Sequence, residues 1–114
     1  MEFKVSSAGS TVVETMLPGT AREMTNVYIM DGDNLLVTHY SAGGNAPLMK
    51  LAKNENGKVA LEFLDATNVP DRKMPYMGGL ELTVSGDDKI MEKWTHFKDG
   101  AAAGEVEFAL ERVK

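Results

Sequence analysis

Runs of alternating apolar and polar residues recur along this chain, and short glycine-containing turns separate them. Four such turns are Asp31-Gly32, Asn56-Gly57, Ser85-Gly86-Asp87 and Asp99-Gly100. A glycine turn of this kind between two alternating runs is a strong local signal for a β-hairpin. The pattern therefore predicts an all-β protein, an antiparallel meander of about eight strands.

The alternation is not equally clear along the whole chain. Residues 80–84 and 105–111 alternate apolar and polar side chains, which is typical of strands with one buried and one solvated face. Residues 90–98 mix polar and apolar side chains on both faces, so the pattern leaves the orientation of that strand open. In residues 66–79, Pro70, Pro75 and the pair Gly78-Gly79 exclude a regular strand and predict one long loop.

The length of 114 residues indicates one domain, residues 1–114. A meander has two edge strands, which must pair with each other or be covered. Because closing an eight-stranded barrel usually takes more chain than this, we expect an open half-barrel whose edges are covered by a second copy in a homodimer. The alternative is a closed monomeric barrel with short strands.

Composition and charge narrow the classes of partner. The net charge is −5, with acidic and basic residues mixed along the chain, so no basic face is expected and nucleic acid is an unsuitable partner. The chain has no cysteine, which excludes disulfides, thiolate metal sites and a cysteine nucleophile. The start of the chain lacks the pattern of a secretory signal, and no segment approaches the roughly 20 apolar residues of a membrane helix. We expect a cytoplasmic protein that does not bind membranes.

Several segments, taken in order, resemble an uncharacterised bacterial family of lipocalin-like, calycin-type β-barrel proteins. They include VETMLPGT at residues 13–20, LVTHY at 36–40, GNAPLM at 44–49 and FLDATN at 63–68, with shorter matches at 94–95, 98–100 and 108–112. The resemblance implies a lipocalin-like barrel with an internal cavity, and it assigns no catalytic residues. Family members generally carry further N-terminal sequence ahead of the position that matches Phe3, which again favours an open half-barrel.

The function that this reasoning favours is non-enzymatic binding of a small apolar or amphipathic molecule in the barrel cavity. Eight methionines suit either core packing or an adaptable apolar wall. The residues expected to contact the ligand are polar groups and large apolar side chains on the predicted strands and one glycine-rich loop. They are Glu14, Tyr28, His39, Tyr40, Asn45, Met49, Phe63, Trp94 and His96.

The two histidines, His39 and His96, each lie in a predicted strand near an aromatic residue. We expect half-buried imidazoles that bond a neighbouring carboxylate or carbonyl. Contact with a ligand is the alternative, and haem ligation, as in the related nitrobindin-type barrels, is a third. Because the sequence places no third ligand at a suitable spacing, we predict no metal and no cofactor.

Glu14 interrupts an apolar run, and we expect it to point outward or to pair with a lysine or arginine. Alternatively, it orients a ligand or acts as a base with His39. Two other functions stay open at this point. One is a self-associating adaptor that binds a peptide or protein through its sheet edge or concave face. The other is a small enzyme that uses His39, Tyr40 and Glu14.

Overall fold

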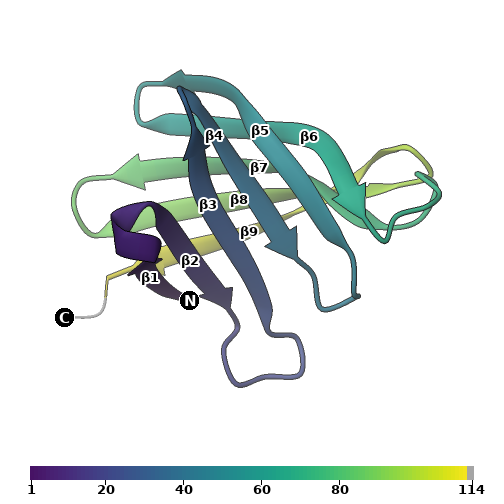
Figure 1. The fold of residues 1–114 in the computed structure, drawn as a ribbon, viewed down its shortest axis with the longest axis horizontal. Helices are drawn as coiled ribbons and strands as arrows, with labels where there is room; N and C mark the ends of the chain where they lie inside the picture. Colours follow the sequence, from purple (N-terminus) through teal and green to yellow (C-terminus); the bar gives the residue numbers. More distant parts are fainter. Residues whose placement is uncertain (113–114) are drawn as a thin grey trace.

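The computed structural model describes residues 1–112 as one nine-stranded antiparallel sheet whose strand order follows the chain (Figure 1). The strands are β1 (Glu2–Ser6), β2 (Thr11–Met16), β3 (Met24–Asp31), β4 (Asn34–Tyr40), β5 (Ala46–Glu55), β6 (Lys58–Thr67), β7 (Tyr76–Ser85), β8 (Lys89–Lys98) and β9 (Ala101–Glu111). A single 3-10 turn, η1 (Ser7–Gly9), joins β1 to β2. The all-β meander is confirmed, with nine strands in place of about eight.

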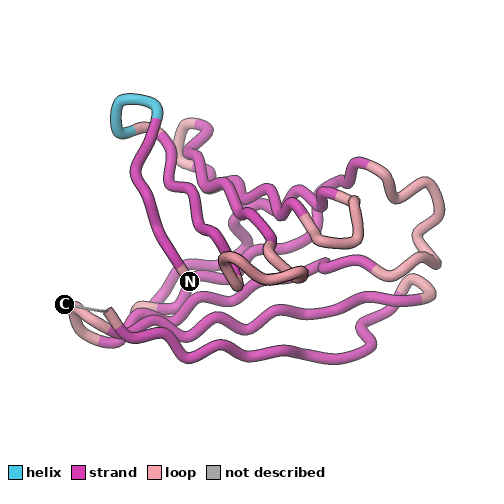
Figure 2. Tube along the Cα trace, turned by 90° about the horizontal axis from the view of Figure 1, so that it is seen from below, coloured by secondary structure: helices cyan, strands magenta, loops and turns pink. Residues whose placement is uncertain are grey.

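The sheet curls over itself into a half-barrel, so that its two ends form facing layers (Figures 1 and 2). The first strand, β1, pairs with β2, and the last, β9, pairs with β8, but β1 and β9 are not hydrogen-bonded to each other. The barrel is therefore open along that side. No helix within the described part of the chain is long and apolar enough to cross a membrane.

Side chains at every second position of the central strands face the interior of the half-barrel. The apolar core consists of Met16, Tyr28, Val37, Met49, Leu61, Leu80 and Trp94. In β8, whose orientation the pattern left open, Glu92 and Trp94 are buried whereas Met91 is 38% exposed. The burial of Trp94 thus decides which face of β8 points inward. Glu92 lies two residues before it on the same face, because side chains alternate along a strand, and is buried with it.

The predicted loop at residues 66–79 is wrong at both ends. β6 continues to Thr67 and β7 begins at Tyr76, so the loop covers only residues 68–75, and Gly78 and Gly79 lie within a strand. A Cβ atom at Gly78 would lie 2.5 Å from the ring of Phe97 on the neighbouring strand. The register between β7 and β8 also shifts between Met77 and Gly79. The glycines therefore permit close packing at a bulge, and they do not end the strand.

Candidate functional site

A group of polar side chains lies inside the half-barrel, and we call it the interior polar cluster. Its members come from β2, β3, β4 and β8, and each is 8% exposed or less. They are Glu14, Asn26, Tyr28, His39, Glu92 and Trp94. Polar groups at this depth are costly unless they are hydrogen-bonded, so their contacts indicate what the interior is built to hold.

The strand register brings three of these side chains together. Glu14 on β2 lies opposite Asn26 on β3, and Asn26 lies opposite His39 on β4. Side chains that face each other across antiparallel strands are close enough to bond directly. Glu92 and Trp94 come from β8, in the other half of the sheet, and complete the cluster because the sheet curls.

The carboxylate of Glu14 is the centre of the hydrogen bonding. Asn26 Nδ2 donates to Glu14 Oε1 at 2.9 Å, and the hydroxyl of Tyr28 donates to the same oxygen at 2.6 Å. The amide of Asn26 then presents its Oδ1 to His39 Nδ1 at 2.6 Å. Because that oxygen can only accept, the Nδ1 of His39 carries the proton and donates it.

Glu92 lies beside Glu14 as a second buried carboxyl group. Trp94 Nε1 donates to Glu92 Oε1 at 3.0 Å. Burial, followed by hydrogen bonding to Glu14 and the negative charge of Glu14, raises the pKa of Glu92 to about 9. Glu92 is therefore protonated at neutral pH and donates its proton to Glu14. Glu14 Oε2 and Glu92 Oε2 are buried and make no hydrogen bond to any other residue of the described chain.

His39 is held neutral within this arrangement. Burial lowers the pKa of His39 to about 4, although the negative charge of Glu14 acts in the opposite direction. The imidazole packs against Trp94 with a centroid separation of 4.7 Å. Its Nε2 is buried and makes no hydrogen bond to any residue from 1 to 112. The cluster thus contains one ring nitrogen with a free lone pair.

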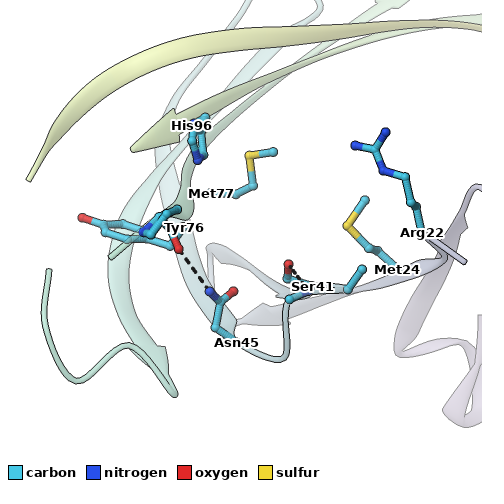
Figure 3. Close-up of a pocket in the computed structure, with 10 residues that line it drawn as sticks. Arg22, Met24, Ser41, Asn45, Tyr76, Met77 and His96 are labelled. Carbon is cyan, nitrogen blue, oxygen red and sulfur yellow. Dashed lines mark hydrogen bonds between the residues drawn. The ribbon is translucent and has the colours of Figure 1, made fainter. Parts of the chain in front are cut away.

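A cleft of about 310 Å³ opens at one end of the half-barrel, and we call it the end cleft. Figure 3 shows side chains from β3, β7 and β8 around it, together with loop residues. Its lining includes Arg22, Met24, Asn45, Tyr76, Met77 and His96. Asn45 donates its Nδ2 to the carbonyl of Pro75 at 3.3 Å, whereas its Oδ1 is buried without a partner in the described chain.

The end cleft lies next to the interior polar cluster along the strands. Met24 is two residues from Asn26 on β3, and His96 is two residues from Trp94 on β8. Two residues along a strand correspond to roughly 7 Å and return the side chain to the same face. The cleft residues therefore form the inward-facing layer directly beyond the cluster.

A second, larger cleft of about 740 Å³ lies along the open side of the half-barrel, lined in part by Met1, Phe3, Ile90 and Leu110. None of the buried polar atoms without a partner belongs to its lining residues. Its polar lining consists of charged side chains, among them Asp87, Lys89, Glu111 and Arg112, and none of these presents a buried polar atom without a partner. For this reason the end cleft is the stronger candidate site.

The structure places the predicted ligand-binding residues in different parts of the half-barrel. Glu14, Tyr28, His39 and Trp94 belong to the interior polar cluster, with Met49 buried in the apolar core, and Asn45 and His96 line the end cleft. Phe63 is half-buried, packs 4.9 Å from the ring of Tyr76 and lies under the guanidinium of Arg72. Tyr40 is 51% exposed on the outer face and does not join the other residues.

The expectation that Glu14 points outward or pairs with a lysine or arginine is wrong. Glu14 is fully buried, and its partners are Asn26 and Tyr28 on the next strand. Val12 and Met16, two positions away on the same face, are apolar and pack in the core, and they are the local signal for its burial that our interpretation missed. His39 is likewise more buried than the half-exposed imidazole that we expected, although its Nδ1 does have a neighbouring acceptor.

Sequence reasoning missed two members of the cluster, Asn26 and Glu92. Asn26 shares its strand face with Tyr28, and Glu92 shares its face with Trp94. The sequence signal for both residues was their position, two residues from a large aromatic residue in the same strand. It does not by itself distinguish a buried partner from a solvated side chain.

Within residues 1–112, no three acidic or histidine side chains are grouped so that they could hold a metal ion. Comparisons of the chain with protein-family models, with curated proteins and with solved structures found no match. The resemblance to a lipocalin-like family therefore remains a prediction.

Proposed function

We propose that the half-barrel binds a small amphipathic molecule, which enters through the end cleft. The observation that carries this proposal is Asn45 Oδ1, a buried acceptor without a partner in the described chain, on the wall of a largely apolar cleft. An unpaired buried acceptor costs roughly 1–3 kcal/mol, and a ligand donor would recover that free energy. Apolar walls with a few convergent polar groups are the usual composition of a small-molecule site.

The apolar walls of the cleft suit a flexible ligand body. Met24 and Met77 line it and also pack against the core. Methionine side chains are unbranched and polarizable, so they adapt to ligands of different shape. We propose binding without catalysis, because the carboxyl groups of Glu14 and Glu92 are occupied by hydrogen bonds within the interior polar cluster and do not line the cleft.

A negative charge in the end cleft is expected to weaken ligand uptake. An environment-sensitive apolar dye should bind the wild-type protein and change the fluorescence of Trp94, the sole tryptophan. Met77→Asp should weaken dye binding at least about tenfold, which corresponds to about 1.4 kcal/mol. Fluorescence titration measures both effects.

The matched control is Met91→Asp, because Met91 lies on the outer face of the adjacent strand β8 and is 38% exposed. This variant should bind the dye as the wild type does, with thermal melting to verify that both variants are folded. Absence of dye binding to the wild type, or equal loss in the two variants, would rule out the end cleft as the site.

A second candidate function is self-association into a homodimer, and the outer face of β2, β3 and β4 favours it. Apart from Asp31 at the end of β3, the outward-facing residues there carry no charge, in contrast to β7 and β8, where Glu81 pairs with Lys93. Ile29 and Tyr40 on this face are 43% and 51% exposed. The full set is Thr11, Val13, Thr15, Thr25, Val27, Ile29, Leu36, Thr38 and Tyr40. Such a face suits burial against a second copy.

Light scattering at micromolar concentration is expected to give the mass of a dimer. Val27→Lys, which puts a charge in the centre of the uncharged face, should convert the protein to a monomer. Thr83→Lys, on the outer face of β7, should leave the dimer intact. A monomer mass for the wild type at all accessible concentrations would eliminate this candidate.

A further inference from the structure

The interior polar cluster determines which nitrogen of His39 is available to a ligand. Glu14 accepts from the Nδ2 of Asn26, which directs the Asn26 Oδ1 toward the His39 Nδ1 at 2.6 Å. The proton of the neutral imidazole is therefore on Nδ1, and Nε2 carries a lone pair. The side chain of His39 is only 1% exposed. Its Nε2 is buried, and no residue from 1 to 112 donates a hydrogen bond to it.

We propose that the Nε2 of His39 accepts a hydrogen bond from the head group of the interior ligand, and that this head group is a neutral donor such as a hydroxyl. The inference rests on the proposed binding function and adds the chemical class of the ligand. The relay from Glu14 through Asn26 to His39 holds the imidazole in the tautomer that accepts. Asn26 and Glu14 are therefore positioning residues, and His39 makes the contact.

The charges around His39 select against other head groups. Glu14 and Glu92 share one proton, so the cluster holds a negative charge and contains no lysine or arginine. A carboxylate or phosphate would be repelled by that charge and would find no donor on Nε2. An ammonium group would lose its hydration on burial, while the charge of Glu14 is already bonded by Asn26 and Tyr28. A neutral hydroxyl avoids both costs.

The ligand reaches His39 from the end cleft. Ser41, which lines the cleft, is two residues beyond His39, and Met24 is two residues before Asn26. Met24 and Met77 line the cleft and pack against the core, and their flexible side chains can rotate to admit the head group. The ring of Trp94, 4.7 Å from His39, then forms an apolar wall beside the bound head group and reports its arrival.

Three probes with the same chain and different head groups test the inference: octanol, octanoate and octylammonium. At neutral pH, titration followed by Trp94 fluorescence should show that octanol binds at least about tenfold more tightly than either ion. His39→Phe retains an aromatic ring but has no acceptor, so it should weaken octanol binding and leave the affinities for the two ions unchanged. Tyr40→Phe is the matched control, because it alters an adjacent ring that faces outward, and it should retain the preference.

Nitrogen NMR of the wild-type protein provides a second measurement, which does not require any variant to fold. The Nε2 resonance of His39 should shift as octanol is added, in the direction of an accepted hydrogen bond, and should stay constant with octanoate. Equal affinities for the three probes, or an Nε2 resonance that octanol leaves unchanged, would overturn the inference while binding itself stands. If neither the probes nor the apolar dye bind, the proposed function fails with it.

Discussion

Glu14→Ala is expected to lower the free energy of unfolding by about 3 kcal/mol or more, the largest effect that we predict for a single substitution. The change removes the acceptor of Asn26 Nδ2 and of the Tyr28 hydroxyl, and also the group to which Glu92 donates. Each buried donor left without a partner costs roughly 1–3 kcal/mol. Denaturant unfolding followed by Trp94 fluorescence measures the loss.

Two variants separate this effect from simple removal of a side chain. Glu107→Ala removes an exposed carboxylate from β9 and should change stability by less than about 0.5 kcal/mol. Glu14→Gln keeps the volume and one acceptor oxygen, and its loss should lie between those of the two alanine variants. A Glu14→Ala protein as stable as the wild type would show that the cluster is not bonded as described.

Stability should fall as the pH rises from neutral toward 9, which is the reverse of the usual behaviour of a paired carboxylate. The folded state holds a proton on Glu92, whose pKa is raised from 4.5 to about 9, whereas the unfolded chain has lost it. A group with a raised pKa stabilises the folded state most below its unfolded pKa, and this contribution declines toward its folded pKa. The slope is up to about 1.4 kcal/mol per pH unit for one proton.

His39 has the opposite effect at lower pH. Because its pKa is lowered from 6.5 to about 4, the unfolded chain binds a proton that the folded state does not, and stability rises with pH in that window. Between pH 4.5 and 6.5 the two contributions cancel, so the stability of the wild type should be nearly constant there and fall above 6.5.

Glu92→Gln tests this profile, because its amide still donates to Glu14 and accepts from Trp94 but cannot titrate. The variant should lose the decline above pH 6.5 and show the rise that His39 produces between pH 4 and 6.5. Urea unfolding of both proteins in one series of buffers compares them, since all other titrating groups are shared. A wild-type stability that is constant or increases from pH 6.5 to 9 would contradict the assignment of the shared proton.

Local sequence signals predicted the hairpins because the chemistry of a tight turn lies within a few residues. Asn56 and Gly57 both adopt positive φ, 53° and 76°, as do Asp99 and Gly100 with 56° and 78°. Asparagine, aspartate and glycine tolerate that conformation, and a hairpin turn of this kind demands it. The all-β meander follows from these turns and from the alternation between them.

The same local reasoning failed at Gly78 and Gly79. Read alone, two glycines near Pro75 indicate a loop, but the ring of Phe97 occupies the space that a side chain at Gly78 would need. That ring belongs to β8, nineteen positions further along the chain. A glycine pair can mark the end of a strand or a place where two strands pack closely, and the sequence is the same in both cases. Only the neighbouring strand distinguishes them.

By itself, the sequence determined most of the strands and their turns, because propensity and alternation act over a few residues. It did not determine which polar side chains meet. Glu14 is buried because Asn26 and Tyr28 face it from β3, and it shares a proton with Glu92 because the curled sheet brings β8 against β2. The tautomer of His39 and the separation of Tyr40 from the site depend on the same curvature and register, which arise from contacts between distant strands.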